Sequence, residues 1–124
     1  MHLNVIDIEE KLKKITMADF LSEFRAYTAE APTRPEYKHP GQEVAGYYMG
    51  TYINLDILEG RIHLSEIRVK RPDRFRGNGS KALDWLVTLA AQFGMTVEAI
   101  AESFDGGTLT DEQIRDWYER HGVR

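Results

Sequence analysis

The sequence predicts a mixed α/β fold of the α+β type, in which antiparallel strands precede a parallel strand–helix–strand unit. Two observations carry this prediction. Residues 44–69 are rich in Tyr, Ile, Val and Leu and contain a turn signal, Glu59-Gly60, which is typical of two or three antiparallel strands. A strongly periodic helix follows, and after Gly94 a second alternating apolar run indicates a strand parallel to the one before the helix.

The N-terminal part is predicted to contain a short strand, over residues 3–6, and two helices. Asp7 and Glu10 have the spacing of a capping box, so the first helix would begin near Ile8, and Thr16 would cap the second. Apolar residues recur every three or four positions in each helix: Ile8, Leu12 and Ile15, then Met17, Phe20, Leu21 and Phe24. Residues 31–41 hold three prolines, Pro32, Pro35 and Pro40, and we expect a loop there that faces a ligand.

Residues 61–69 show an interrupted strand pattern. Ile62 and Leu64 have two-residue spacing. The next apolar pair, Ile67 and Val69, is displaced, so the period slips by one residue across Ser65-Glu66. An extra residue in a strand predicts a β-bulge, which leaves ladder groups unpaired and re-aims side chains, often beside an active site.

The second half of the chain is predicted as helix, strand and helix. A helix over residues 79–93 presents one wide apolar stripe, made of Ala82, Leu83, Leu86, Leu89, Ala90 and Phe93. Gly94 ends this helix, and residues 95–101 form a strand with Met95, Val97, Ala99 and Ala101 on one face. Thr110 and Gln113 then have capping-box spacing, and the last helix ends at Gly122.

The stretch Arg74-Phe75-Arg76-Gly77-Asn78-Gly79-Ser80 predicts a phosphate site at the start of the long helix. Glycines let backbone N–H groups approach a ligand, the helix start presents unpaired donors, and arginine binds phosphate bidentately. The alternative is a tight turn that binds no ligand. A Rossmann fingerprint can be fitted to residues 77–82, but antiparallel strands precede it and the chain left after Gly94 is short for that fold. A Walker A motif is absent from the sequence.

Composition excludes several other classes of function. The chain of 124 residues is long enough for one domain, and its net charge of −4 argues mildly against nucleic acid as a partner. It has no cysteine, which excludes disulfides and a cysteine nucleophile, and it has no H-x-x-H spacing, so we expect no metal. With no long apolar run and no secretory signal pattern, we expect a cytoplasmic protein that does not enter a membrane.

Three motifs together resemble the GNAT superfamily of acyl-CoA-dependent N-acetyltransferases. Residues 74–79 match the signature Q/R-x-x-G-x-G/A, which lies between a bulged strand and a long helix in that family. The strand end Ile67-Arg68-Val69 and the helix end Trp117-Tyr118-Glu119-Arg120-His121-Gly122-Val123 also resemble family motifs. The resemblance is detailed over residues 61–123, and it implies a single domain over residues 1–124 with a mixed central sheet and helices on both faces.

The resemblance also implies which residues bind acetyl-CoA. The backbone of Ile67, Arg68 and Val69 would pair with the pantetheine arm. The pyrophosphate would be held by the residues of the glycine-rich stretch and the lysine after it: Arg74, Phe75, Arg76, Gly77, Asn78, Gly79, Ser80 and Lys81.

Two residues are the expected catalytic groups. By resemblance, Tyr118 is the acid that protonates the departing thiolate, although a core aromatic would have the same spacing. Glu66, at the bulge, is the first candidate base, because partial burial would raise the pKa of its carboxyl group. Glu98 and Glu102 are the alternative bases. We expect His63, His121 and Trp117 to have structural roles.

The expected activity is direct transfer of an acetyl group from acetyl-CoA to an unidentified amine, a small molecule or a protein, in a ternary complex. A GNAT-like interaction module without catalysis is the alternative. Family members continue into two further strands after the position of Val123, which this chain lacks. We therefore expect the fifth strand to be an exposed edge, which a homodimer would cover.

Overall fold

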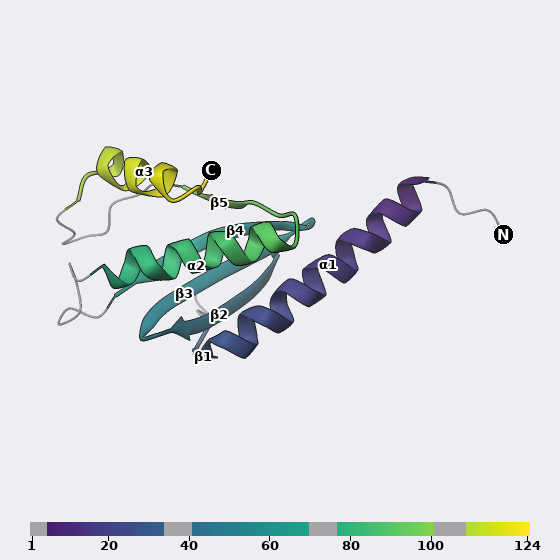
Figure 1. The fold of residues 1–124 in the computed structure, drawn as a ribbon, viewed down its shortest axis with the longest axis horizontal. Helices are drawn as coiled ribbons and strands as arrows, with labels where there is room; N and C mark the ends of the chain where they lie inside the picture. The colour runs from purple at the N-terminus through teal and green to yellow at the C-terminus, as the bar shows by residue number, and fades with distance from the viewer. Residues whose placement is uncertain (1–4, 34–40, 70–76, 101–108) are drawn as a thin grey trace.

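The computed structural model describes residues 5–33, 41–69, 77–100 and 109–124, except for the side chains of residues 5–7 and 10–15. A five-stranded sheet of order β1-β2-β3-β4-β5 forms one layer, and helices form the other (Figure 1). The elements are α1 (Val5–Tyr27), β1 (Ala29–Glu30), β2 (Gln42–Tyr48), β3 (Thr51–Leu58), β4 (Arg61–Arg68), α2 (Asn78–Gln92), β5 (Val97–Ala99) and α3 (Asp111–Arg120). The predicted mixed sheet is confirmed.

The antiparallel part of the sheet consists of two tight hairpins. β2 pairs with β3 and β3 pairs with β4, both antiparallel. The predicted turn at Glu59-Gly60 is confirmed, and Met49-Gly50 forms the other one. Both residues of each turn have positive φ, 53° and 73° in the first and 47° and 85° in the second. Such two-residue turns match the twist of the strands that they join.

The predicted bulge in β4 is confirmed. Leu55 of β3 lies opposite Leu64, but the next pair is Asn54 and Glu66, so Ser65 is the extra residue. The apolar residues on either side of the bulge therefore point to the same face of the sheet, as the slipped pattern requires.

The predicted parallel pair is also confirmed, although β5 is shorter than expected. β5 pairs with β4 in parallel from Ile62↔Val97 to Leu64↔Ala99. The expectation that the free edge of β5 is exposed is wrong at its two bonded positions. Arg124 N–H donates to the Val97 carbonyl at 2.9 Å, and Ala99 N–H donates to the Arg124 carbonyl at 2.7 Å. Arg124 thus extends the sheet beside β5. Because the edge of β5 is covered at these two positions, an exposed edge no longer supports the expected homodimer.

Two N-terminal predictions are wrong. Val5 and Ile6 belong to α1 rather than to a strand, and the two expected helices are one helix of 23 residues. Residues 7–27 contain no glycine or proline, so nothing interrupts the backbone ladder, and Thr16 is a helix-interior residue instead of a cap. None of the described helices is both long enough and apolar enough to cross a membrane.

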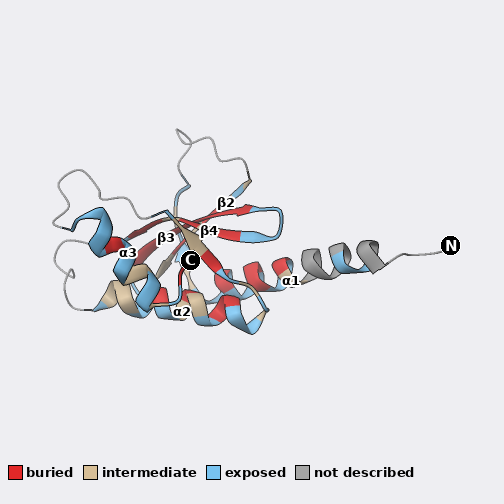
Figure 2. Cartoon of the chain, turned by 90° about the horizontal axis from the view of Figure 1, so that it is seen from above, coloured by how far each residue is buried: buried red, intermediate tan, exposed pale blue. Residues whose placement is uncertain are grey.

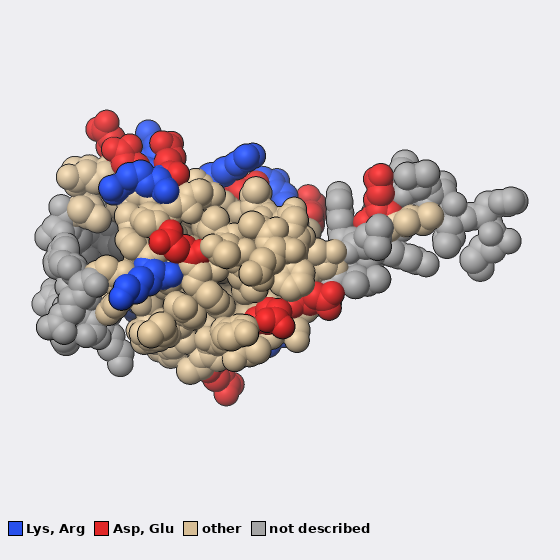
Figure 3. Space-filling view, viewed as in Figure 1, with Lys and Arg blue, Asp and Glu red and all other residues tan. Residues whose placement is uncertain are grey.

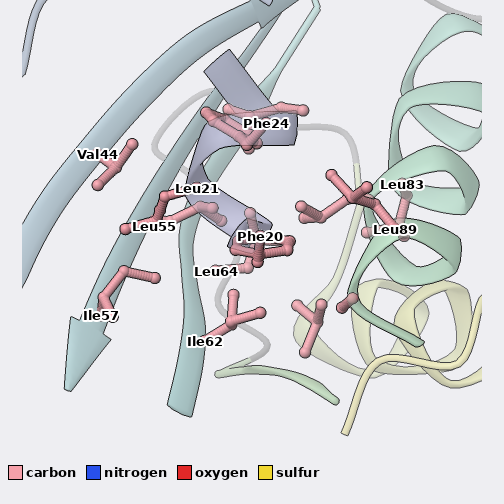
Figure 4. Packing of buried hydrophobic residues seen from close by; sticks show 14 of the residues in the cluster. Phe20, Leu21, Phe24, Val44, Leu55, Ile57, Ile62, Leu64, Leu83 and Leu89 are labelled. Atoms are coloured by element: carbon pink, nitrogen blue, oxygen red, sulfur yellow. The ribbon is translucent and has the colours of Figure 1, made fainter. Parts of the chain in front are cut away.

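The hydrophobic core lies between one face of the sheet and the helices. In Figure 4 Phe20 and Phe24 of α1 and Leu83 of α2 lie in the space between the strands and α2. The core unites α1, four strands, α2 and the C-terminal end in one cluster of buried side chains: Met17, Phe20, Leu21, Phe24, Val44, Ile53, Leu55, Ile57, Ile62, Leu64, Ile67, Ala82, Leu83, Leu86, Leu89, Ala90, Val97 and Val123.

The described helices all lie on the core side of the sheet, so the expectation of helices on both faces is wrong for the part of the chain that the structure describes. α1 and α2 share that side (Figure 2). α3 packs beside α2, where the indole of Trp117 bonds to Ser80 and His121 bonds to Asp84. The opposite face of the sheet carries polar side chains, and these matter for the candidate site.

The ends of α2 and α3 follow the predicted signals. Gly94 and Gly122 have φ of 71° and 84°, and the backbone bonds around both glycines have the Schellman pattern. At the start of α3, Gln113 N–H donates to the Thr110 hydroxyl while the Gln113 side chain accepts from the Thr110 N–H, so the predicted capping box is confirmed.

Candidate functional site

An opening in the strand ladder begins where the β4 bulge lies. β4 extends to Arg68, but its pairing with β5 stops at Leu64↔Ala99. From the bulge to the end of β4, no described strand pairs with its outer edge. The predicted pantetheine-binding residues Ile67 and Arg68 lie on this stretch, and Val69 follows it directly.

The N-terminus of α2 is arranged to attract an anion. Gly77 is its N-cap residue with φ of 80°, no side chain forms a capping hydrogen bond, and the first turn contains no acidic residue. The unpaired N–H groups of a first turn, together with the helix dipole, favour a negatively charged partner. Lys81, one turn into the helix, is exposed. Arg74, Phe75 and Arg76 lie outside the described residues.

α3 contacts both the end of β4 and the start of α2. Trp117 Nε1 donates to Ser80 Oγ at 2.9 Å. A methyl group on Gly79 would lie 3.3 Å from Val69 Cγ2 and 3.6 Å from Trp117 Cζ2. A side chain at position 79 would therefore crowd Val69 by a few tenths of an ångström and lie in ordinary contact with Trp117. The Trp117 contact joins residues that are far apart in the sequence, so the pattern of α3 alone could not reveal it.

Tyr118 is half-buried against the core, next to Trp117, with ring centroids 5.3 Å apart. Burial raises the pKa of its phenol above the ordinary value of about 10. The phenol is therefore protonated at neutral pH, which is the state that a general acid needs. The same packing fits the alternative of a core aromatic residue.

The raised pKa of Tyr118 predicts a loss of stability in alkali. Below about pH 10 the phenol is neutral in the folded and unfolded chain, so its contribution is complete. As pH rises through the folded-state pKa, the unfolded chain loses the proton first, and the free energy of unfolding falls. Denaturant titrations between pH 8 and 11 should show a shallower fall for Tyr118→Phe. Tyr27 is 62% exposed, and the Tyr27→Phe control should keep the wild-type slope. Equal slopes for all three proteins would contradict the prediction.

Glu66 is buried on the polar face of the sheet, with a side chain only 4% exposed. Its Oε1 lies 3.7 Å from Nη1 of Arg68. The guanidinium of Arg68 in turn lies 5.2 Å from the ring centroid of Tyr52. The predicted base is therefore a buried carboxyl group near the guanidinium of Arg68, rather than a solvated strand residue.

Sequence reasoning missed a group of polar residues on β2 and β3 that surrounds Glu66. Tyr52, Asn54 and Asp56 alternate with the core residues of β3 and are all buried. The Asn54 amide donates to Glu43 Oε1 at 3.2 Å and to Tyr52 Oη at 3.1 Å, and Tyr52 Oη donates to the Pro32 carbonyl at 2.9 Å. Their alternation with apolar residues was visible in the sequence, but their burial was not.

The other candidate residues have different surroundings. Glu98 is held by Arg61 through a contact of 2.6 Å between Nη2 and Oε2, which makes it a weaker candidate base than Glu66. Glu102 lies outside the described residues. His63 is half-buried on β4, and His121 Nδ1 lies 2.5 Å from Oδ1 of Asp84, joining α3 to α2. The contact of His121 with Asp84 fits the structural role expected for this histidine.

Acidic and basic side chains are interspersed on the face shown in Figure 3, and the described ones do not gather there into a patch of one sign. Among the described residues, no group of three or more His, Asp or Glu side chains is placed to hold a metal ion. No family model, curated protein or solved structure gives a significant match to this chain.

Proposed function

We propose that this chain is an acyl-CoA-dependent N-acetyltransferase that transfers the acetyl group directly to an amine. The observation that carries the proposal is the bulged strand β4, whose outer edge has no described partner after Leu64 and which leads to a glycine-capped helix without an acidic first turn. A strand edge that no described strand pairs with suits the amides of pantetheine, and a helix N-terminus suits a pyrophosphate. The GNAT-like motifs lie at these same positions.

In the proposed reaction, the amine nitrogen attacks the thioester carbonyl carbon and the carbon–sulfur bond breaks. Glu66 accepts, directly or through water, the proton that the alkylammonium loses before attack, because an alkylammonium with a pKa of about 10.4 is not a nucleophile. The nitrogen loses its second proton to solvent water after attack. The thiolate of CoA takes a proton from Tyr118, whose burial keeps the phenol protonated, and Tyr118 regains a proton from solvent. N–H groups of residues 78–80 bind the pyrophosphate, and Lys81 adds positive charge.

The proposal predicts that CoA binding depends on Gly77 but not on Gly94. Both glycines have positive φ at an end of α2, and at both a Cβ would meet nothing within 4 Å. Alanine should therefore cost each variant a similar stability, about 1 kcal/mol. Only in Gly77→Ala does the added methyl group lie at the proposed phosphate site. We expect CoA to raise the melting temperature of the wild type and Gly94→Ala, and to bind Gly77→Ala about tenfold more weakly or worse.

The same proteins separate an enzyme from a binding module. Thiol release from acetyl-CoA with a panel of amines should be measurable for the wild type and Gly94→Ala and reduced for Gly77→Ala. Stabilisation by CoA without thiol release from any amine would leave the interaction module as the function. Stabilisation by NADH but not by CoA, or equal CoA affinity in both variants, would overturn the proposed cofactor site.

A further inference from the structure

Two polar contacts with the same spacing join α3 to α2. Trp117 Nε1 donates to Ser80 Oγ at 2.9 Å. One turn further along both helices, His121 Nδ1 lies 2.5 Å from Oδ1 of Asp84. The partners are four residues apart on each helix and occur in the same order, so the two helices run parallel here. Val123, which follows α3, lies in the core. The indole of Trp117 is therefore fixed beside the first turn of α2.

The bond between Trp117 and Ser80 has only one possible direction. An indole carries one N–H donor and no acceptor, whereas a serine hydroxyl accepts hydrogen bonds and also donates its own proton. Ser80 Oγ is therefore the acceptor in this bond. Within the described part of the chain, the Ser80 hydroxyl has no second bond in which it donates. Since Ser80 is only half-buried, its proton is available to a ligand or to water.

The Ser80 hydroxyl belongs to the end of α2 that lacks intrahelical partners. Ser80 is the third residue of this helix, and the Cα–Cβ bonds of an α-helix tilt toward its N-terminus. The backbone N–H groups of the first turn point the same way and have no partner within the helix. A hydroxyl whose oxygen already accepts a hydrogen bond is polarised and becomes a better donor. Phosphate oxygens are the acceptors that suit this set of donors best.

We propose that Trp117 is a positioning residue for a phosphate site at the start of α2. Its indole N–H holds Ser80 Oγ in place, so that the serine hydroxyl donates its proton to a phosphate oxygen. With the pyrophosphate of CoA as ligand, this role rests on the proposed function, whereas inorganic pyrophosphate presents the same oxygens without it. Because Tyr118 is the next residue of α3, one helix would orient the phosphate donor and carry the proposed acid.

The indole N–H signals in nuclear magnetic resonance spectra test this role directly. The chain has two tryptophans, so two such signals are expected, and Trp117→Phe assigns them. The probes are inorganic pyrophosphate and CoA, added to the full chain at constant ionic strength. A bound phosphate should strengthen the bond from Trp117 and shift its signal saturably. Trp85 stacks on Tyr48 beyond the first turn of α2, and its signal should not move. Ser80→Ala should abolish the shift.

A double-mutant cycle separates positioning from simple packing. Trp117→Phe keeps an aromatic ring beside Gly79 but removes the N–H donor. We expect Ser80→Ala and Trp117→Phe each to weaken CoA binding about three- to tenfold. The double variant should bind CoA no more weakly than Ser80→Ala alone, because Trp117 acts through the serine hydroxyl. The matched control Trp85→Phe removes the same atoms from the other tryptophan and should keep the wild-type affinity. Circular dichroism checks that each variant is folded.

The outcomes separate this role from the proposed function. If the protein binds CoA without a shift of the Trp117 signal, or if Trp117→Phe weakens binding equally with and without Ser80→Ala, the positioning role is overturned and the acetyltransferase stands. A shift with pyrophosphate that depends on Ser80, in a protein that does not bind CoA, would support the role and overturn the acetyltransferase. Both are overturned if neither probe binds.

Discussion

Deletion of Ser65 should abolish CoA binding and leave the fold intact. Ser65 is the extra residue of the bulge, and without it residues 62–68 alternate regularly between core and polar positions. The strand pairs on both sides of the bulge keep their partners, and the ladder becomes continuous. We expect the free energy of unfolding to change by about 1 kcal/mol or less. The bulge re-orients the outer edge of β4, to which we assign binding of the pantetheine arm. This arrangement would be lost.

The measurement combines urea denaturation with CoA-dependent melting, and deletion of Asn54 is the control. That deletion removes a residue from a regularly paired strand, so it moves the residues on one side of the gap to the wrong face and should unfold the protein. Full CoA binding after deletion of Ser65 would show that the bulge is not part of the cofactor site. Unfolding of that variant would show that the bulge is a structural requirement instead.

Replacement of Phe24 by alanine should lower the free energy of unfolding by about 3–5 kcal/mol. Phe24 is completely buried, its ring lies 5.7 Å from that of Trp85 on α2, and a Cβ on Gly46 would lie 3.1 Å from Phe24 Cε1. The ring therefore fills the space between α1, α2 and β2. The free energy of unfolding of a domain is typically about 5–15 kcal/mol. The cavity left by this single substitution therefore removes a large share of it.

Denaturant titration followed by circular dichroism and Trp fluorescence measures this loss. Tyr27→Ala, one turn later in α1 with a ring 62% exposed, is the matched control and should cost about 1 kcal/mol or less. A loss below about 1 kcal/mol for Phe24→Ala would contradict the position of α1 over the sheet.

The predictions that held depend on patterns confined to neighbouring residues. The period of two, and its slip, located the bulge to the pair Ser65-Glu66, because each strand residue must point to one face or the other. The signals for the capping box at Thr110 and for the helix end at Gly94 were also confined to a few neighbouring residues. α1 shows the limit of this reasoning, since Thr16 has the same capping chemistry as Thr110 but lies within an uninterrupted helical run.

The candidate site was only partly predictable. The strand end and the α2 start were identified from motifs, and the structure joins them through contacts of Trp117 with the first turn of α2. The buried polar residues around Asn54 could not be predicted, because an alternating polar residue on a strand is usually solvated. Their burial depends on which face of the sheet the rest of the chain covers.

By itself, the sequence determined the strands on either side of the Glu59-Gly60 turn, the bulge and the glycine-capped helix, because periodicity, turn residues and caps act over a few neighbouring positions. Only the tertiary structure decided that the described helices share one face, that Arg124 continues the sheet beside β5, and that Asn54 lies opposite Glu66 at the bulge. Those features depend on contacts between residues that are distant in the chain. A pattern confined to neighbouring residues carries no information about the free energies of such contacts.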